Sequence, residues 1–401
     1  MDELVRLTSC SVEKPLRILA VVNTPWDPRL GAARVWIELA EEWRKAGHVV
    51  EKFCLTDAYP EPPPSGAFAA LRLLFFPSLA AKFIRNNASR FDVVDALIGT
   101  VPFTKRSLGF RGLLVARSVG LYHLYEKFER MAASRWPAPA KGKFASRAFY
   151  RFFYSRARTT SDRSVQRCDL LNVPNSDEVT AVRDELHAAA PVISQPYGLA
   201  PERAKALREN TAPAERRLQK KKIVFVGMWS PRKGAKEWGR IVRHVRNRVP
   251  DARFVFLGTM IQDDAVWRDL ELEPADFVEI VPQFDPDDLP RLLADCTLGV
   301  FPSYIEGFGM AIVEQLAARL PTFAYDVPGP RDILRDLPQL LVPAGDVDAL
   351  GDGICEILTG DLSRYEELAQ RSEQIAGNFS WPDIARETIA EYRKHLHDVH
   401  G

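Results

Sequence analysis

The stretch FPSYIEGFGMAIVE (residues 301–314) joins a short apolar run to an amphipathic segment through a turn that holds Gly307 and Gly309. Glycine permits unusual backbone dihedral angles and lets a ligand approach the main chain closely. A helix that begins near Met310 would direct free N–H groups and the positive end of its dipole towards an anion. The pattern therefore predicts a strand–turn–helix unit with a ligand at the turn.

Two glutamates flank this turn, Glu306 and Glu314, with seven residues between them. Glu314, one turn into the predicted helix, can accept hydrogen bonds from two vicinal hydroxyls such as those of a ribose. Glu306, on the loop, can do the same for a hexose. The plainer interpretation is that both are solvated residues at a helix end, but the glycines and the strand–turn–helix context favour ligand binding.

A second stretch, IVFVGMWSPRKG (residues 223–234), reads as a buried strand that ends at Gly227, followed by a loop that presents Arg232 and Lys233 before Gly234. A lysine in this place is a point charge suited to a diphosphate, and it can stabilise the negative charge on a leaving group. A solvated basic turn is the alternative. The place of the loop, after the first strand of the second half, favours phosphate binding.

Apolar runs alternate with amphipathic segments along both halves of the chain, which indicates parallel sheets. We expect an α/β protein of two Rossmann-like, doubly wound domains that face a central cleft, with ligands at the carboxyl ends of the strands. The expected parts are an N-terminal Rossmann-like domain (1–200), a polar linker (201–221), a C-terminal Rossmann-like domain (222–381) and a last helix (382–401). The expected strands lie at 16–23, 48–55, 92–97, 112–118, 168–175, 191–198, 222–228, 252–258, 277–282, 297–303 and 321–326.

Bulk composition narrows the class of protein. The 401 residues are 46% hydrophobic with a net charge of +1, which predicts a packed globular protein without a general attraction to nucleic acid. The five cysteines form no CxxC pair, so we expect no disulfide framework or zinc site, and a reducing, cytoplasmic compartment. The start MDELVRLTSC does not read as a signal peptide. The apolar stretch 67–84 is interrupted by Arg72, Pro77 and Lys82, which argues against a membrane span.

Together these stretches resemble glycosyltransferase family 4, retaining enzymes of the GT-B fold, over most of the chain. Arg232-Lys233-Gly234 stands where the family's phosphate loop ends in Lys-Gly, and Glu306 and Glu314 match its paired glutamates. VISQPYGL (192–199) resembles the end of the family's first domain. FSWPDIARETIAEYRKHL (379–396) resembles its closing helix, which crosses back onto that domain.

The resemblance implies a role for each site residue. Lys233 should bind the donor diphosphate, Glu314 the ribose, and Glu306 the donor sugar together with the backbone around Phe308 and Gly309. Lys233 and Glu306 are the expected catalytic pair, and no metal or cofactor is expected. The full donor set is Gly227, Arg232, Lys233, Pro282, Gln283, Glu306, Phe308, Gly309, Met310, Ala311 and Glu314, with Pro282 and Gln283 beside the base. The acceptor-side set is Gly31, Val119, Gly120 and His123.

This chain departs from the family pattern at three places. Met228 replaces a phosphate-binding arginine, and Arg232 can supply that charge from another direction. Val119 stands in the place of a histidine, in Ser118-Val119-Gly120, and His123 is too far along the chain to substitute directly. ARLP (318–321) replaces a small-Gly-x-Pro arrangement.

The segment 141–167 is basic and aromatic, with Asp162 as its one acidic residue. Such a helix suits an anionic membrane surface, or it packs its aromatic rings on the N-terminal domain. Stacking on single-stranded nucleic acid has no other support in the sequence. The basic residues are Lys141, Lys143, Arg147, Arg151, Arg156, Arg158, Arg163 and Arg167.

The function predicted from the sequence is retaining transfer of a hexose from a nucleotide diphosphate sugar to a hydroxyl of a carbohydrate or lipid-linked acceptor. Polysaccharide, glycolipid or glycoconjugate synthesis is the expected setting, in the cytoplasm with peripheral contact to an anionic membrane. Two alternatives remain open. One is a nucleotide-sugar epimerase on the same fold. The other, motivated by Met228 and Val119, is a non-catalytic protein that binds nucleotide sugars or acts as a scaffold.

Overall fold

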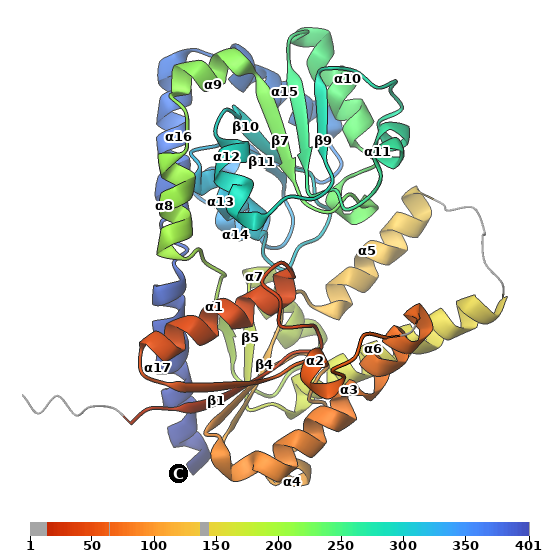
Figure 1. Ribbon diagram of the computed structural model, residues 1–401, viewed down its shortest axis with the longest axis vertical. Helices are drawn as coiled ribbons and strands as arrows, with labels where there is room; N and C mark the ends of the chain where they lie inside the picture. The colour runs from red at the N-terminus through yellow and green to blue at the C-terminus, as the bar shows by residue number, and fades with distance from the viewer. Residues whose placement is uncertain (1–13, 64, 137–143, 401) are drawn as a thin grey trace, which may run out of the picture.

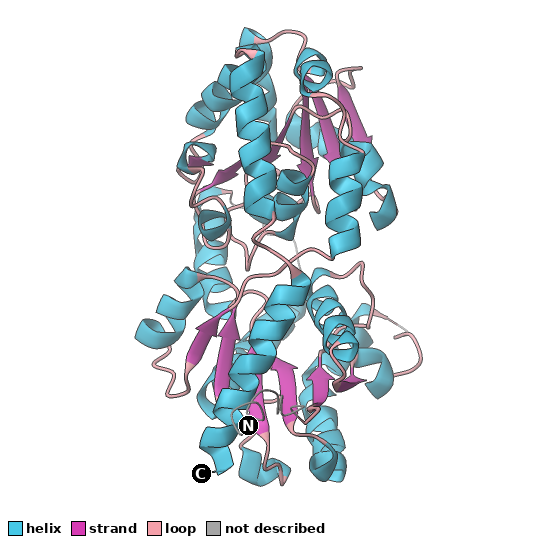
Figure 2. Ribbon diagram, turned by 90° about the vertical axis from the view of Figure 1, so that its left-hand side faces the viewer, coloured by secondary structure: helices cyan, strands magenta, loops and turns pink. Residues whose placement is uncertain are grey.

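The structure is a computed structural model that describes residues 14–63, 65–136 and 144–400, without the side chains of 144–151 and 398–400. Two halves lie one above the other, each built on one six-stranded sheet (Figure 1). Figure 2, a view from the side, shows helices covering the strands of both sheets. All recorded pairings in the sheets are parallel, as the alternating sequence pattern predicts.

The N-terminal sheet has the strand order β2-β1-β3-β4-β5-β6. The chain leaves β1 for β2 on one side and continues to β3 on the other, so the topological switch point lies between β1 and β3. The strands are almost wholly apolar because helices cover both faces of a parallel sheet. Their bounds are β1 Arg17–Val21, β2 Val49–Phe53, β3 Val93–Leu97, β4 Leu113–Arg117, β5 Leu170–Val173 and β6 Val192–Ser194.

The longer helices of the N-terminal half pack apolar residues into its core. The first buries Val35, Leu39 and Trp43, the face that the sequence predicts. The helices are α1 Gly31–Lys45, α2 Leu55–Ala58, α3 Gly66–Asn87, α4 Lys105–Leu108, α5 Tyr122–Arg135, α6 Phe144–Arg167 and α7 Ser176–Thr180.

The apolar stretch around residues 67–84 forms α3. One side of this helix packs Phe76 and Ile84 into the N-terminal core. The other side leaves Phe68 and Phe75 more than half exposed, at 54% and 60%. Among the described residues, Gly66–Arg90 is the one helical segment long and apolar enough to cross a membrane; its most apolar 18-residue window has a mean hydropathy of 1.6, and 28% of that window is buried.

The C-terminal sheet has the order β12-β11-β10-β7-β8-β9. Its switch point lies between β7 and β10, because the chain turns to β8 on one side and later returns to β10 on the other. The bounds are β7 Lys222–Val226, β8 Arg253–Leu257, β9 Val278–Val281, β10 Leu298–Phe301, β11 Thr322–Tyr325 and β12 Leu341–Val342.

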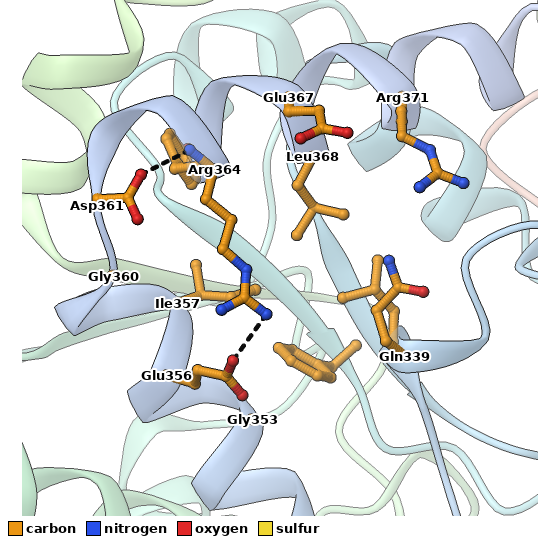
Figure 3. A pocket seen from close by; sticks show the side chains of 13 residues that line it. Gln339, Gly353, Glu356, Ile357, Gly360, Asp361, Arg364, Glu367, Leu368 and Arg371 are labelled. Carbon is orange, nitrogen blue, oxygen red and sulfur yellow. Dashed lines mark hydrogen bonds and ion pairs between the residues drawn. The ribbon is translucent and has the colours of Figure 1, made fainter.

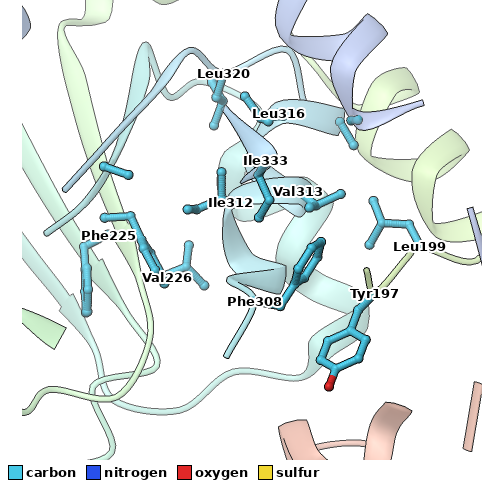
Figure 4. Close-up of a cluster of buried hydrophobic side chains, with 14 of the residues drawn as sticks. Tyr197, Leu199, Phe225, Val226, Phe308, Ile312, Val313, Leu316, Leu320 and Ile333 are labelled. Carbon is cyan, nitrogen blue, oxygen red and sulfur yellow. The ribbon is translucent and has the colours of Figure 1, made fainter. Parts of the chain in front are cut away.

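The helices of the C-terminal half surround a core that continues beneath the loop after β10. Ile312, Val313 and Leu316 of α13 lie in it with Phe225 and Val226 of β7 (Figure 4). The helices are α10 Trp238–Arg248, α11 Asp263–Leu270, α12 Leu289–Leu293, α13 Met310–Ala317, α14 Pro330–Ile333, α15 Val347–Thr359 and α16 Leu362–Ala376.

The segment 201–221, expected as a polar linker, is helical and attached to the C-terminal half. It forms α8 (Pro201–Glu209) and α9 (Ala214–Lys220). Arg217 is buried and donates to the carbonyl of Arg319 at 2.7 Å. Composition suggested an open linker, but its arginines bind acceptors of the C-terminal half that lie far away in sequence.

The last helix, α17 (Trp381–His400), runs from the C-terminal half down along the N-terminal one (Figure 1). Its Tyr392 hydroxyl donates to Asp95 and accepts from Arg117 Nη2 at 2.9 Å. Asp95 and Arg117 form a buried ion pair at 2.9 Å. This buried triad fixes the end of the chain to β3 and β4.

Replacing Asp95 tests this triad. Asp95→Ala leaves the buried guanidinium of Arg117 without its carboxylate, so we expect the free energy of unfolding to fall by about 3–5 kcal/mol. Tyr392→Phe keeps the ion pair and should cost only about 1 kcal/mol. Urea denaturation of both variants measures the two losses, and equal losses would show that the ion pair is not the dominant interaction.

Candidate functional site

The loops after β7 and β10 flank the switch point of the C-terminal sheet and bring Lys233 and Glu306 together. Lys233 ends a short 3₁₀ turn, Pro231–Lys233, and its Nζ lies 2.6 Å from Glu306 Oε1. The same Nζ lies 4.6 Å from the centroid of the Phe301 ring. Burial lowers the pKa of Lys233, and the carboxylate of Glu306 opposes that effect. Lys233 is therefore a largely desolvated cation, and an anionic ligand can replace Glu306 as its partner.

Two glycines allow these loops to come together. Gly234 has a φ of +78°, and a Cβ there would lie 2.3 Å from the Pro302 carbonyl oxygen, so the two loops touch backbone to backbone. Gly309, with a φ of +111°, precedes α13. The first N–H groups of α13, at Met310 and Ala311, have no acceptor within the helix and suit an anion.

Glu314, on the second turn of α13, is buried between two arginines. Its Oε1 lies 3.1 Å from Arg34 Nη1 of α1 and 2.7 Å from Arg203 Nε of α8. Burial acts to raise the pKa of Glu314, but the two guanidinium groups outweigh it and leave that pKa lowered. Glu306 and Glu314 are thus not solvated helix-end residues, because both are buried and ion-paired.

The loop Ser118–Gly120, after β4 in the N-terminal half, meets the loop after β10 in the C-terminal half. A Cβ added at Gly307 would lie 2.2 Å from the carbonyl oxygen of Val119. The Asn175 side chain donates to the Gly307 carbonyl. Arg232 Nη1 donates to the Tyr125 hydroxyl at 3.1 Å. These contacts hold the two halves closed around the site.

Other predicted residues lie at the edge of the site that Lys233, Glu306 and Glu314 form. Phe308 is buried against Tyr197, with ring centroids 5.3 Å apart, so only its backbone can face a ligand. Gly227, with a φ of +151°, ends β7, and the Met228 side chain beside it is half exposed. Gly31 opens α1 with open space where a Cβ would stand.

Two predicted residues, Pro282 and His123, contact other parts of the chain. The Pro282 carbonyl accepts from Met260 N–H at 3.0 Å, and Gln283 follows it in the loop after β9. His123 Nε2 lies 2.5 Å from Glu185 Oε2, so its imidazole is engaged within the N-terminal half. Neither pairing involves Lys233 or Glu306.

Arg34, Arg203, Tyr125 and Asn175 are site residues that the sequence analysis did not identify. Arg34 and Arg203 contact Glu314 of α13, Tyr125 contacts Arg232, and Asn175 contacts Gly307, each from a distant part of the chain. Arg34 had one local signal, because it follows the glycine of RLGAAR within one helical turn.

Glu178 supports the Ser118–Gly120 loop from below. It is fully buried, and its Oε1 accepts from the N–H of Leu121 at 3.2 Å. Burial raises the pKa of Glu178 to about 7, against hydrogen bonds from Ser118 and Leu121 that favour the carboxylate.

A separate hollow between α15 and α16 lies outside this site. Glu356, Asp361 and Arg364 line it, and the Glu356–Arg364 ion pair of 2.8 Å spans part of it (Figure 3). None of the predicted donor or acceptor residues lines this hollow.

Comparison with known proteins agrees with the fold and the resemblance. Residues 208–375 match the family model of glycosyl transferases group 1. O-antigen chain mannosyltransferase B of Escherichia coli is 27% identical over 175 residues, which are 42% of this chain and 45% of that protein. The chain thus matches less than half the length of that relative.

Solved structures match nearly the whole chain. Sucrose-phosphate synthase from Thermosynechococcus elongatus aligns with a TM-score of 0.71 and 18% identity, over 94% of this chain and 98% of that one. A trehalose-6-phosphate structure from E. coli, bound with UDP-2-fluoro glucose, aligns with a TM-score of 0.64 and 14% identity over 94% and 98%. The predicted GT-B fold and the resemblance to glycosyltransferases are confirmed.

The contact between Gly307 and Val119 can be tested by adding one methyl group. In Gly307→Ala the new Cβ would clash with the Val119 carbonyl, which is backbone and cannot move aside as a side chain can. We expect the two halves to separate, with a larger radius of gyration in small-angle X-ray scattering. Gly66→Ala, where a Cβ meets open space, is the control. A Gly307→Ala scattering curve identical to that of the control would show that this contact does not hold the halves together.

The raised pKa of Glu178 predicts a pH-dependent stability. The folded protein keeps this proton up to about pH 7, whereas the unfolded chain loses it near 4.5. The free energy of unfolding should therefore fall as pH rises from 5 to 8, by up to about 3 kcal/mol from this group. Glu178→Gln is neutral throughout and should show a smaller fall in urea denaturation at the two pH values. The same fall in both proteins would contradict the assignment.

Proposed function

We propose that the chain is a retaining glycosyltransferase that moves a hexose from a nucleotide diphosphate sugar to an acceptor hydroxyl. The observation that carries this proposal is the Lys233–Glu306 pair beside the first turn of α13, at the switch point of a Rossmann-like sheet. The similarity to glycosyl transferases group 1 over residues 208–375 supports the activity. The UDP-2-fluoro glucose bound in a structure of the same fold supports the donor class.

In this proposal the donor diphosphate replaces Glu306 as the partner of Lys233. Arg232 and the N–H groups at the start of α13 add positive charge, and Glu306 becomes free to hold hydroxyls of the sugar. Arg34 and Arg203 both contact Oε1 of Glu314, which leaves the other carboxylate oxygen for the ribose. Gly227, Pro282 and Gln283 would border the nucleotide.

The transfer itself breaks the bond between the anomeric carbon and the oxygen of the donor phosphate, which departs with the electron pair. The acceptor oxygen bonds to the same carbon on the same face, and its proton passes to the departing phosphate. Lys233 stabilises the charge that develops on that phosphate, so we propose that no metal or other cofactor is needed. The acceptor would enter past Val119 and Gly120, from the N-terminal half.

We place the protein in the cytoplasm, in peripheral contact with an anionic membrane. Support comes from α6, where Phe152 is 62% exposed and Arg156, Arg158 and Arg163 are exposed. Lys141 and Lys143 of the predicted basic segment lie outside the described residues. The Arg147 and Arg151 side chains are not described either.

A non-catalytic nucleotide-sugar-binding protein is a second candidate. It is favoured by Val119, which cannot donate a hydrogen bond, and by Met228, whose half-exposed side chain carries no charge for a phosphate. Such a protein would bind the donor without turnover.

The variant Lys233→Ala tests whether Lys233 takes part in the reaction or only stabilises the fold through its ion pair with Glu306. Loss of this charge should lower turnover by about 10²–10³-fold, because stabilisation of the leaving group is lost. Lys236→Ala is the matched control, since Lys236 lies three residues on and pairs with Asp269. The measurement is nucleotide release from UDP- and GDP-sugars with a mixture of acceptors. Binding of nucleotide without release by the wild type would support the second candidate, and equal activity of the two variants would remove Lys233 from the mechanism.

A further inference from the structure

The N-terminal half contains a cavity of about 240 Å³ at its own switch point. Asn23 lines it just after β1, and Ile98 and Gly99 line it just after β3. Ligands of doubly wound sheets bind at such points, beyond the carboxyl ends of the strands. The cavity thus lies at the switch point of the N-terminal sheet. Lys233 and Glu306 lie beside the corresponding point of the C-terminal sheet.

This cavity adjoins the donor loop. Val119 and Gly120 line it, and the Val119 carbonyl is the group against which Gly307 packs. The loop Ser118–Gly120 therefore separates a molecule held in the cavity from the loop that carries Glu306. This position suits the acceptor of the sugar.

Most residues that line the cavity are apolar, and the polar ones are Asn23, Tyr122, Arg156, Thr160 and Ser161. Helix α3 contributes Leu74 and Pro77, and helix α6, which packs against α3, contributes Phe153 and Ala157. A free sugar or a polar glycan needs hydrogen-bond partners for its hydroxyls when they leave water. Aliphatic and aromatic walls offer few partners and suit a hydrocarbon group instead.

The apolar surface continues beyond the cavity along the outside of the same two helices. Phe68, Leu71 and Phe75 of α3 are 54%, 37% and 60% exposed, at the i, i+3 and i+7 spacing that lines up one helical face. Phe152, next to the cavity residue Phe153, is 62% exposed. Leu71 and Phe75 lie within one helical turn of the cavity residue Leu74, so exposed apolar side chains of α3 stand next to the cavity lining.

One charge marks the edge of this cavity. Arg156 lines it, is exposed, and its guanidinium forms no ion pair or hydrogen bond that the described part of the chain supplies. A cation at the rim of an apolar pocket is complementary to an anionic group that is covalently attached to a hydrocarbon, such as a phosphate ester.

We propose that the acceptor of this protein is an anionic amphiphile. Its hydrocarbon chain lies between α3 and α6 and continues along Phe68, Leu71 and Phe75 into a bilayer, its anionic group pairs with Arg156, and its head presents a hydroxyl to the donor loop. This inference rests on the proposed function and names the substrate class of its acceptor side. It also gives α3 a role as an in-plane anchor, with Phe76 and Ile84 packed inwards.

The test uses dodecyl phosphate below its micelle concentration as the probe, with inorganic phosphate and dodecyl glucoside as the two half-probes. Isothermal titration of the full chain should show binding of dodecyl phosphate, no binding of inorganic phosphate, and about tenfold weaker binding of dodecyl glucoside. Ala157→Phe fills the cavity and should weaken dodecyl phosphate binding at least about tenfold. Ser155→Phe adds the same ring at an exposed position of α6 and should leave binding unchanged.

A second pair of variants tests the charge. Arg156→Gln should weaken dodecyl phosphate to the affinity of dodecyl glucoside, and Arg163→Gln, on the same helix outside the cavity, should not. Titration of UDP and GDP on every variant reports the donor site separately and should be unchanged. Equal effects of Ala157→Phe and Ser155→Phe, or no dodecyl phosphate binding by a protein that binds nucleotide, would overturn this inference alone. A wild type that binds neither nucleotide would instead remove the proposed function.

Discussion

The close contact between Gly307 and the Val119 carbonyl is the constraint on which the site depends. It lets the loop after β10 touch the loop after β4, and the short distance leaves no room for a side chain at position 307. Asn175 and Tyr125 reinforce it from the N-terminal half through Gly307 and Arg232. In the proposed transferase, a donor bound at Lys233 and Glu306 would have no acceptor surface opposite it without that approach.

Each half contributes the switch point of its sheet to this site. The switch point of the C-terminal sheet, between β7 and β10, is bordered by a cation, a carboxylate and the first turn of α13. The switch point of the N-terminal sheet, between β1 and β3, is bordered by a largely apolar cavity with Arg156 at its rim. The loops that follow the strands thus give the two switch points different linings on sheets of the same architecture.

The sequence predicted best what depends on neighbours in the chain. The strand ends, Gly309 and the start of α13 follow from local patterns. The 2.6 Å contact between Lys233 and Glu306 was not predicted, because the two residues lie far apart in the chain. The contacts of Arg34 and Arg203 with Glu314 could not be found that way, because they span 280 and 111 residues. The helices in 201–221 were missed for a related reason: a polar, proline-containing segment looks like a linker until its arginines find distant acceptors.

A crystal structure of the protein with UDP or GDP bound tests the central claim most directly, since it shows where the diphosphate lies. The account predicts a phosphate oxygen within hydrogen-bond distance of Lys233 Nζ, a ribose beside Glu314, and Glu306 released from the lysine. A nucleotide bound elsewhere, or bound here with the Lys233–Glu306 pair intact, would contradict it.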